Sequence, residues 1–174
     1  VDMQPTFLQT IVEANRITAR CRFAIETAAL FGIRTIFTEQ SPEKLGPTDT
    51  DLLAVAPDAS VLAKTTFSAF GAKGFSKKLH DEGIRHLLLA GIETSVCIYN
   101  TAIHAQAHEL ETTLLQDCVG ARRPCDAESV LQFLREKSDC HVLPAETIFY
   151  SLLNDANNPL FRDFTKLVKK YGDQ

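Results

Sequence analysis

The sequence predicts an α/β protein: a three-layer α/β/α sandwich with a mostly parallel sheet. Short apolar runs alternate along the chain with longer segments of helical periodicity. One run, 86–92, is almost continuously apolar, which is typical of a strand buried on both faces. Because parallel strands need helical crossovers of one hand, this alternation places helices on both faces of the sheet. The 174 residues suffice for one such domain, which we assign to 1–174.

Each element follows from a local pattern. Val1 and Asp2 are expected to end a first strand whose start is missing from the sequence. Residues 11–31 carry apolar side chains mostly three and four positions apart, which predicts an amphipathic helix that stops at Gly32. Residues 39–50 are rich in Pro, Gly, Ser and charge, which indicates a loop. The other strands are predicted at 34–38, 61–65, 86–92, 112–117 and 141–143, and the other helices at 75–82, at 95–108, from Asp126 as N-cap, and from Asn158 as N-cap with Pro159 in the first turn.

Composition narrows the classes of function. The 18 Lys and Arg residues against 22 Asp and Glu give a net charge of −4, so we expect no nucleic-acid partner. No apolar run is long enough to span a membrane and no signal peptide is visible, so we expect an intracellular protein, cytoplasmic or organellar, with no membrane partner. The cysteines are odd in number and lack a Cys-x-x-Cys motif, which indicates a reduced protein with neither disulfides nor a zinc site: Cys21, Cys97, Cys118, Cys125 and Cys140.

Three reactive side chains follow predicted strands. Asp2 ends the first strand, Lys64 lies near the end of 61–65, and Cys97 begins the helix after 86–92. The carboxyl ends of parallel strands meet at one edge of the sheet, where ligands bind in such folds. Each residue alone has a common structural role, such as a helix cap or an inert buried thiol. Together they predict a nucleophilic thiol whose pKa is lowered by the helix N-terminus and by Lys64, with Asp2 as proton acceptor.

The same residues carry a family resemblance. The segment 90–98, AGIETSVCI, resembles the signature of the isochorismatase-like cysteine hydrolases, and Asp2-Met3-Gln4 resembles their first-strand motif. Lys64 lies where that family has its lysine. The branch of isochorismatase domain-containing proteins is the most similar, on the segments 38–40, 45–48, 62–65 and 160–170.

This resemblance implies a mechanism and a set of site residues. Cys97 would be the nucleophile, Asp2 the proton acceptor and Lys64 the group that holds and polarises them, in hydrolysis of a carbon–nitrogen bond of a small amide through a thioester. It also implies a cis peptide bond between Ile92 and Glu93, with the N–H groups of Glu93 and Cys97 facing the substrate oxygen. The metal-binding members have Asp and His after the second strand, whereas residues 38–42 here contain no His, so we expect no metal and no cofactor.

Other residues near this edge are candidate contacts. The polar side chains of Gln4, Gln40 and Thr94 are expected to contact a small-molecule substrate. Phe67 and Phe70 either line an apolar wall of the site or fill an interface.

Weaker signals have simpler interpretations. His104 and His108, four apart on one predicted helix, are interpreted as a surface or interface pair, and Arg122-Arg123 as a solvated turn. The apolar stripe of the last helix favours a homo-oligomer.

Two rival functions stay open beside the hydrolase. One is a non-enzymatic protein-binding module on the same fold. The other is a thiol redox sensor that uses Cys97, with Cys118 as the candidate resolving cysteine.

Overall fold

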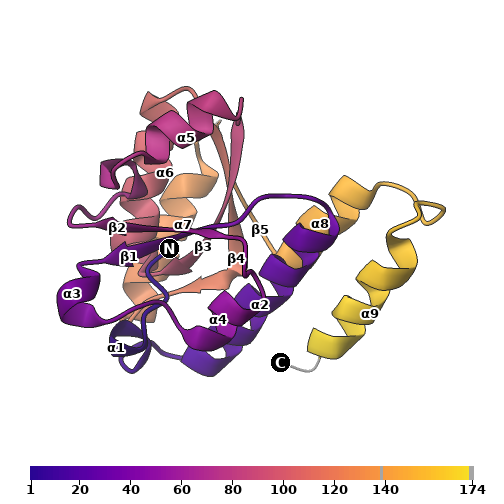
Figure 1. Ribbon diagram of the computed structural model, residues 1–174, viewed down its shortest axis with the longest axis horizontal. Helices are drawn as coiled ribbons and strands as arrows, with labels where there is room; N and C mark the ends of the chain where they lie inside the picture. The colour runs from indigo at the N-terminus through magenta and orange to yellow at the C-terminus, as the bar shows by residue number, and fades with distance from the viewer. Residues whose placement is uncertain (138, 173–174) are drawn as a thin grey trace.

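The computed structural model describes residues 1–137 and 139–172, and Figure 1 shows their arrangement. It confirms an α/β architecture in which parallel strands are covered by helices on both sides. β1 pairs with β2 in one sheet, and β4 lies between β3 and β5 in another. The strands in this part of the chain are β1 (Ile36–Gln40), β2 (Ser60–Lys64), β3 (His86–Ile92), β4 (Glu111–Gly120) and β5 (Cys140–Leu143).

Helices form the outer layers. The described residues contain α1 (Pro5–Leu8), α2 (Ala14–Leu30), α3 (Pro42–Leu45), α4 (Thr50–Ala54), the 3-10 turn η1 (Ala69–Gly71), α5 (Phe75–Asp81), the π-helical turn η2 (Thr94–Ile98), α6 (Tyr99–Ala107), α7 (Pro124–Arg135), α8 (Ala145–Leu153) and α9 (Phe161–Tyr171). Helices α2, α4, α8 and α9 share one apolar core, whereas α5, α6 and α7 cover the opposite face. Over residues 1–137 and 139–172, no helix combines the length and apolar character that crossing a membrane requires.

The alternation of side chains along β4 explains the two cores. Leu114 packs with Leu131 of α7 on one face of the sheet. The next residue, Leu115, packs on the other face with Phe23 of α2 and Phe149 of α8. Successive apolar residues of one strand therefore hold helices on both of its faces.

Val1 and Asp2 join the two sheets. The Val1 amino group donates to the carbonyl of Ala90, Val1 O accepts from Ile92 N, and Asp2 N donates to Thr38 O. Val1 therefore bonds to β3 as a residue of a parallel strand would, and Asp2, with a left-handed backbone at φ of +51°, ends this extended path. Beside this junction, a cavity of about 640 Å³ lies between β1, β3 and α2, with mostly apolar lining.

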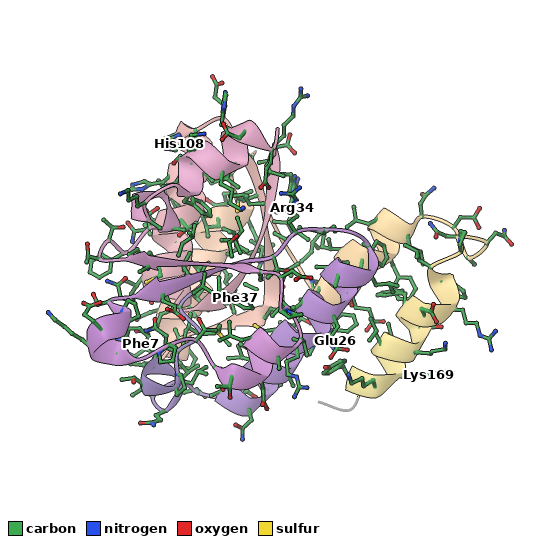
Figure 2. All side chains as sticks on the ribbon, viewed as in Figure 1. Phe7, Glu26, Arg34, Phe37, His108 and Lys169 are labelled. Carbon is green, nitrogen blue, oxygen red and sulfur yellow. The ribbon has the colours of Figure 1, made fainter. Side chains whose placement is uncertain are left out.

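The C-terminal helix is fastened to α2. Glu26 of α2 accepts hydrogen bonds from Lys170 and from the hydroxyl of Tyr171, and it faces α9 in Figure 2. Arg20, also in α2, pairs with Asp117 of β4 at 2.8 Å in a largely buried ion pair. These polar contacts fix α9 and β4 against the same helix.

Several predicted boundaries are wrong. The loop predicted at 39–50 contains α3 and the start of α4, and β1 extends to Gln40 because pairing with β2, rather than residue preference, sets its ends. The prediction omitted α8, although Ala145, Phe149 and Leu153 repeat every four residues and are buried. The two predicted N-caps, Asp126 and Asn158, are also wrong. Helix α7 begins at Pro124 with Arg123 as its N-cap, and α9 begins at Phe161 with Leu160 as its N-cap.

Candidate active site

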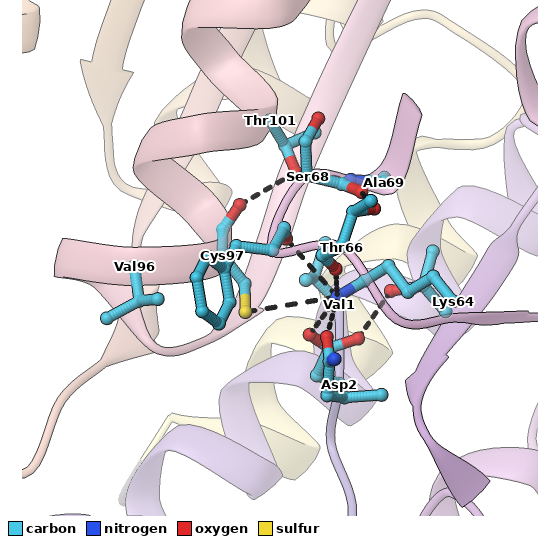
Figure 3. Close-up of polar contacts among 12 residues, drawn as sticks. Val1, Asp2, Lys64, Thr66, Ser68, Ala69, Val96, Cys97 and Thr101 are labelled. Atoms are coloured by element: carbon cyan, nitrogen blue, oxygen red, sulfur yellow. Dashed lines mark hydrogen bonds and ion pairs between the residues drawn. The ribbon is translucent and has the colours of Figure 1, made fainter. Parts of the chain in front are cut away.

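The structure brings Asp2, Lys64 and Cys97 together. Asp2 lies at the junction between β1 and β3, Lys64 is the last residue of β2, and Cys97 lies in η2 directly after β3. Lys64 Nζ is 2.6 Å from Asp2 Oδ2 and 3.9 Å from Cys97 Sγ, as the dashed lines in Figure 3 mark. All three side chains are buried, so water screens their interactions weakly.

Lys64 is the centre of this cluster. Besides the Asp2 carboxylate, its ammonium donates to Gln40 Oε1 at 2.8 Å, Thr66 O at 3.1 Å and Phe67 O at 3.2 Å. A buried ammonium requires such partners, because it has lost its hydration shell. The position of the charge is therefore fixed by both β1 and the segment 65–71, which follows β2.

Asp2 is held at both carboxylate oxygens. Its Oδ2 pairs with Lys64, and its Oδ1 accepts a hydrogen bond from the Thr38 hydroxyl at 2.8 Å. Together with the backbone bond from Asp2 N to Thr38 O, these contacts fix the carboxylate beside the thiol. Such a carboxylate can accept a proton from the sulfur without first rotating into place.

The state of the Cys97 thiol contradicts the sequence-based expectation. Burial raises the pKa of Cys97 to about 12, and the charge of Asp2 and its hydrogen bond to the thiol raise it as well. The Lys64 ammonium and the N–H of Glu93 act in the opposite direction and do not overcome burial. The thiol at rest therefore keeps its proton, and it lies beside the carboxylate that can accept it.

Glu93 connects the thiol to Arg122, an exposed residue of the predicted solvated turn. The Ile92–Glu93 peptide bond is cis, and the Glu93 N–H interacts with the Cys97 sulfur. The Glu93 carboxylate accepts from the backbone N–H of Arg122 at 3.1 Å and from Arg122 Nε at 2.9 Å. Arg122 is thus not merely part of a solvated turn. Its position two residues beyond β4, at the carboxyl edge of the sheet, was the available signal.

The predicted polar contacts divide into two groups. Both ends of the Gln4 amide are occupied by the backbone, with Gln40 N, Gln40 O and Gly46 O as partners. Gln40 holds Lys64 and Thr65 O. The amides of Gln4 and Gln40 therefore hold other parts of the site in place. The buried hydroxyl of Thr94, by contrast, has no hydrogen-bond partner among the described residues. Contact between any of them and a substrate stays a prediction.

The two phenylalanines differ in exposure. Phe67 is 59% exposed beside the Lys64 ammonium, because its carbonyl faces Lys64 while its ring faces solvent. Phe70 instead stacks on His108 and packs edge-on against Phe75. Of the two, Phe67 is therefore the one whose ring is free to contact a substrate or another protein next to Lys64. In the described part of the chain, no three His, Cys, Asp or Glu side chains gather closely enough to hold a metal ion.

A parallel α/β fold with a buried thiol, carboxylate and ammonium at one sheet edge defines a class of candidate thiol hydrolases. The isochorismatase domain model matches residues 1–146. This chain belongs to the isochorismatase family.

Relatives and solved structures agree with this assignment. Mouse isochorismatase domain-containing protein 2A is 30% identical over 170 residues, which cover 97% of this chain and 80% of the mouse protein. A Caenorhabditis elegans structure described as MAR1 ribonuclease has a TM-score of 0.88 and 25% identity, over 97% of this chain and 86% of that one. The Escherichia coli YcaC gene product, described as an octameric hydrolase of unknown specificity, shows the same fold at a TM-score of 0.84 and 20% identity, over 99% of this chain and 91% of that one.

Proposed function

We propose that the protein is a cysteine-dependent hydrolase that cleaves the carbon–nitrogen bond of a small amide through a thioester. The observation that carries the proposal is the contact of one buried thiol with a carboxylate, an ammonium and a backbone N–H. Each of these groups has a role in acyl transfer that its geometry supports.

The first half of the reaction forms the thioester. The Cys97 thiol transfers its proton to Asp2 as the sulfur attacks the carbonyl carbon of the amide. The N–H groups of Glu93 and Cys97 stabilise the oxyanion of the tetrahedral intermediate. Asp2 then returns the proton to the nitrogen, the carbon–nitrogen bond breaks, and the amine leaves. Lys64 keeps the carboxylate in place throughout.

The second half regenerates the thiol. Water attacks the thioester carbon while Asp2 accepts one of its protons, and the new intermediate collapses by breaking the carbon–sulfur bond. The proton on Asp2 returns to the sulfur, and the carboxylic acid departs. No redox partner is required, because no atom changes its oxidation state overall.

The test uses turnover and the covalent intermediate together. A panel of small primary amides is assayed for ammonia release, and quenched reactions are analysed by mass spectrometry for an acyl group on Cys97. We expect Cys97→Ala to abolish both signals and Cys125→Ala, at an exposed thiol, to leave both unchanged. Ammonia release that persists in Cys97→Ala would exclude the proposed mechanism.

The redox-sensor alternative is less well supported. Sensor cysteines need thiolate character, whereas burial raises the pKa of both Cys97 and Cys118. The Cys118 thiol also donates to Arg20 O in the core beside α2 and interacts with Cys21 there. Peroxide treatment that joins Cys97 to Cys118 would favour the sensor.

The binding-module alternative and the assembly state need separate tests. The 59% exposed ring of Phe67 suits either an apolar substrate group or an interface.

By analogy with the octameric relative, we propose a homo-oligomer, which light scattering tests against the monomer mass of 19.3 kDa. Ribonuclease activity is named in the description of the worm protein, whereas the net charge of −4 favours a small-molecule substrate here.

A further inference from the structure

We propose that Thr101 is a positioning residue that sets the distance between the Lys64 ammonium and the Cys97 sulfur. This inference rests on the proposed function of that site. Thr101 lies in α6, one helical turn after Cys97, and is fully buried. Its hydroxyl donates to Cys97 O at 2.7 Å and accepts from Ala69 N at 3.0 Å (Figure 3). One oxygen atom therefore connects the segment that bears the nucleophile to the segment that follows Lys64.

The segment 65–71 fixes the position of Lys64 together with Asp2 and Gln40. Its carbonyl groups at Thr66 and Phe67 accept from the Lys64 ammonium. The segment is also braced internally, because the Thr66 hydroxyl donates to Ser68 O at 2.8 Å and Ser68 Oγ accepts from Phe70 N at 3.2 Å. Such a braced segment moves as a unit, so its attachment to α6 decides its position relative to the sulfur.

The second hydrogen bond of Thr101 is the informative one. A threonine hydroxyl within a helix often bonds to the carbonyl four residues earlier, and that bond alone has no functional meaning. Here the same hydroxyl also satisfies a buried backbone N–H that is 32 positions away in the sequence. If the Thr101 hydroxyl were removed, the N–H of Ala69 and the carbonyl of Cys97 would each lose a hydrogen-bond partner in a buried region. The segment 65–71 would then separate from α6, and the ammonium would move away from the sulfur.

The experiment compares Thr101→Val with Thr101→Ser. Valine keeps the shape and removes the hydroxyl, whereas serine keeps the hydroxyl. Thr113→Val is the matched control, because Thr113 is also buried and its hydroxyl contacts His86 rather than the site. For each variant, the rate of Cys97 alkylation is measured against pH by mass spectrometry, and kcat and KM are measured on an amide found by the screen.

We expect Thr101→Val to lower kcat by roughly tenfold to a hundredfold with little change in KM, because reacting groups displaced by about 1 Å lose catalytic efficiency. Its alkylation rate at pH 8 is expected to fall, since the ammonium that favours the thiolate has moved away. Thr101→Ser should restore both values, and Thr113→Val should change neither. A folded Thr101→Val with wild-type kcat and pH dependence would overturn the inference.

Two outcomes separate this inference from the proposed function. If no amide is hydrolysed but Thr101→Val still shifts the alkylation profile, the positioning role stands and the hydrolase proposal fails. If amides are hydrolysed and Thr101→Val is indistinguishable from wild type, only the positioning role fails. Should Thr101→Val not fold, Ala69→Pro removes the same hydrogen bond from the donor side at the first position of η1, which tolerates proline.

Discussion

Replacing Asp2 by Asn removes a charge from the site while keeping the size of the side chain. Lys64 Nζ lies 2.6 Å from Asp2 Oδ2 and 3.9 Å from Cys97 Sγ, so the carboxylate oxygen and the sulfur are at most about 6.5 Å apart. With an effective dielectric constant of about 20, two negative charges at that separation repel by about 2.6 kcal/mol, a pKa change of nearly two. We expect Asp2→Asn to lower the pKa of Cys97 from about 12 toward about 10.

Alkylation and turnover should then change in opposite directions. At pH 8 the thiolate fraction of Cys97 rises about a hundredfold, while the lower basicity of the thiolate reduces its nucleophilicity by about tenfold, so iodoacetamide should react about tenfold faster. Amide hydrolysis should fall by about 10² to 10⁴, because the proton acceptor is lost. The exposed thiol of Cys125 is an internal reference for the alkylation rate.

Faster alkylation combined with slower hydrolysis in Asp2→Asn would distinguish a lost base from a general loss of structure. Lys64→Met removes the neighbouring positive charge, so it should raise the pKa of Cys97 and slow alkylation. Retention of the fold is checked for both variants by circular dichroism. If Asp2→Asn leaves the alkylation rate unchanged or lowers it, or if the variant still hydrolyses amides at the wild-type rate, Asp2 is not the base.

Three further changes probe packing beside the site and buried polar groups in α2. Gly71→Ala should reduce both stability and turnover, because a Cβ atom there would lie 2.0 Å from the Thr66 hydroxyl oxygen; unchanged kcat in the folded variant would contradict this. Thr27→Val should raise the free energy of unfolding by up to about 1 kcal/mol, because the buried Thr27 hydroxyl has no partner within the described residues, and a lower melting temperature would refute it. Arg20→Met should lower that free energy by about 3 to 5 kcal/mol in urea titrations by leaving Asp117 without its cation, and a loss below 1 kcal/mol would show that Ala145 N and water suffice.

The sequence was sufficient for the architecture and for the proximity of three reactive side chains. Parallel strands place their carboxyl ends together, so a side chain at the end of each of several strands could be assigned to one site without coordinates. Asp2, Lys64 and Cys97 were found in this way, and the structure brings them together.

Pairwise contacts between distant segments could not be predicted in this way. The direction of the Cys97 pKa depends on how fully the thiol is buried and on how close the carboxylate lies, and a helix N-terminus alone suggested the opposite direction. Arg122 contacts Glu93 from 29 positions away, and the Gln4 amide is occupied by backbone groups of a later segment. The position of Arg122 just beyond β4 places it at the carboxyl edge of the sheet, but no local pattern identifies Glu93 as its partner.

The junction formed by Val1 and Asp2 links activity to the alignment of the sheets. These residues bond to β3 through Ala90 and Ile92 and to β1 through Thr38, while Asp2 also holds Lys64. A displacement of these two residues from either strand would therefore move the proposed base away from the proposed nucleophile while every helix stays intact. On heating, hydrolysis should disappear at a lower temperature than the far-ultraviolet dichroism signal, because the site depends on the few hydrogen bonds that hold Val1 and Asp2, whereas the dichroism reports the helices and strands of the whole chain.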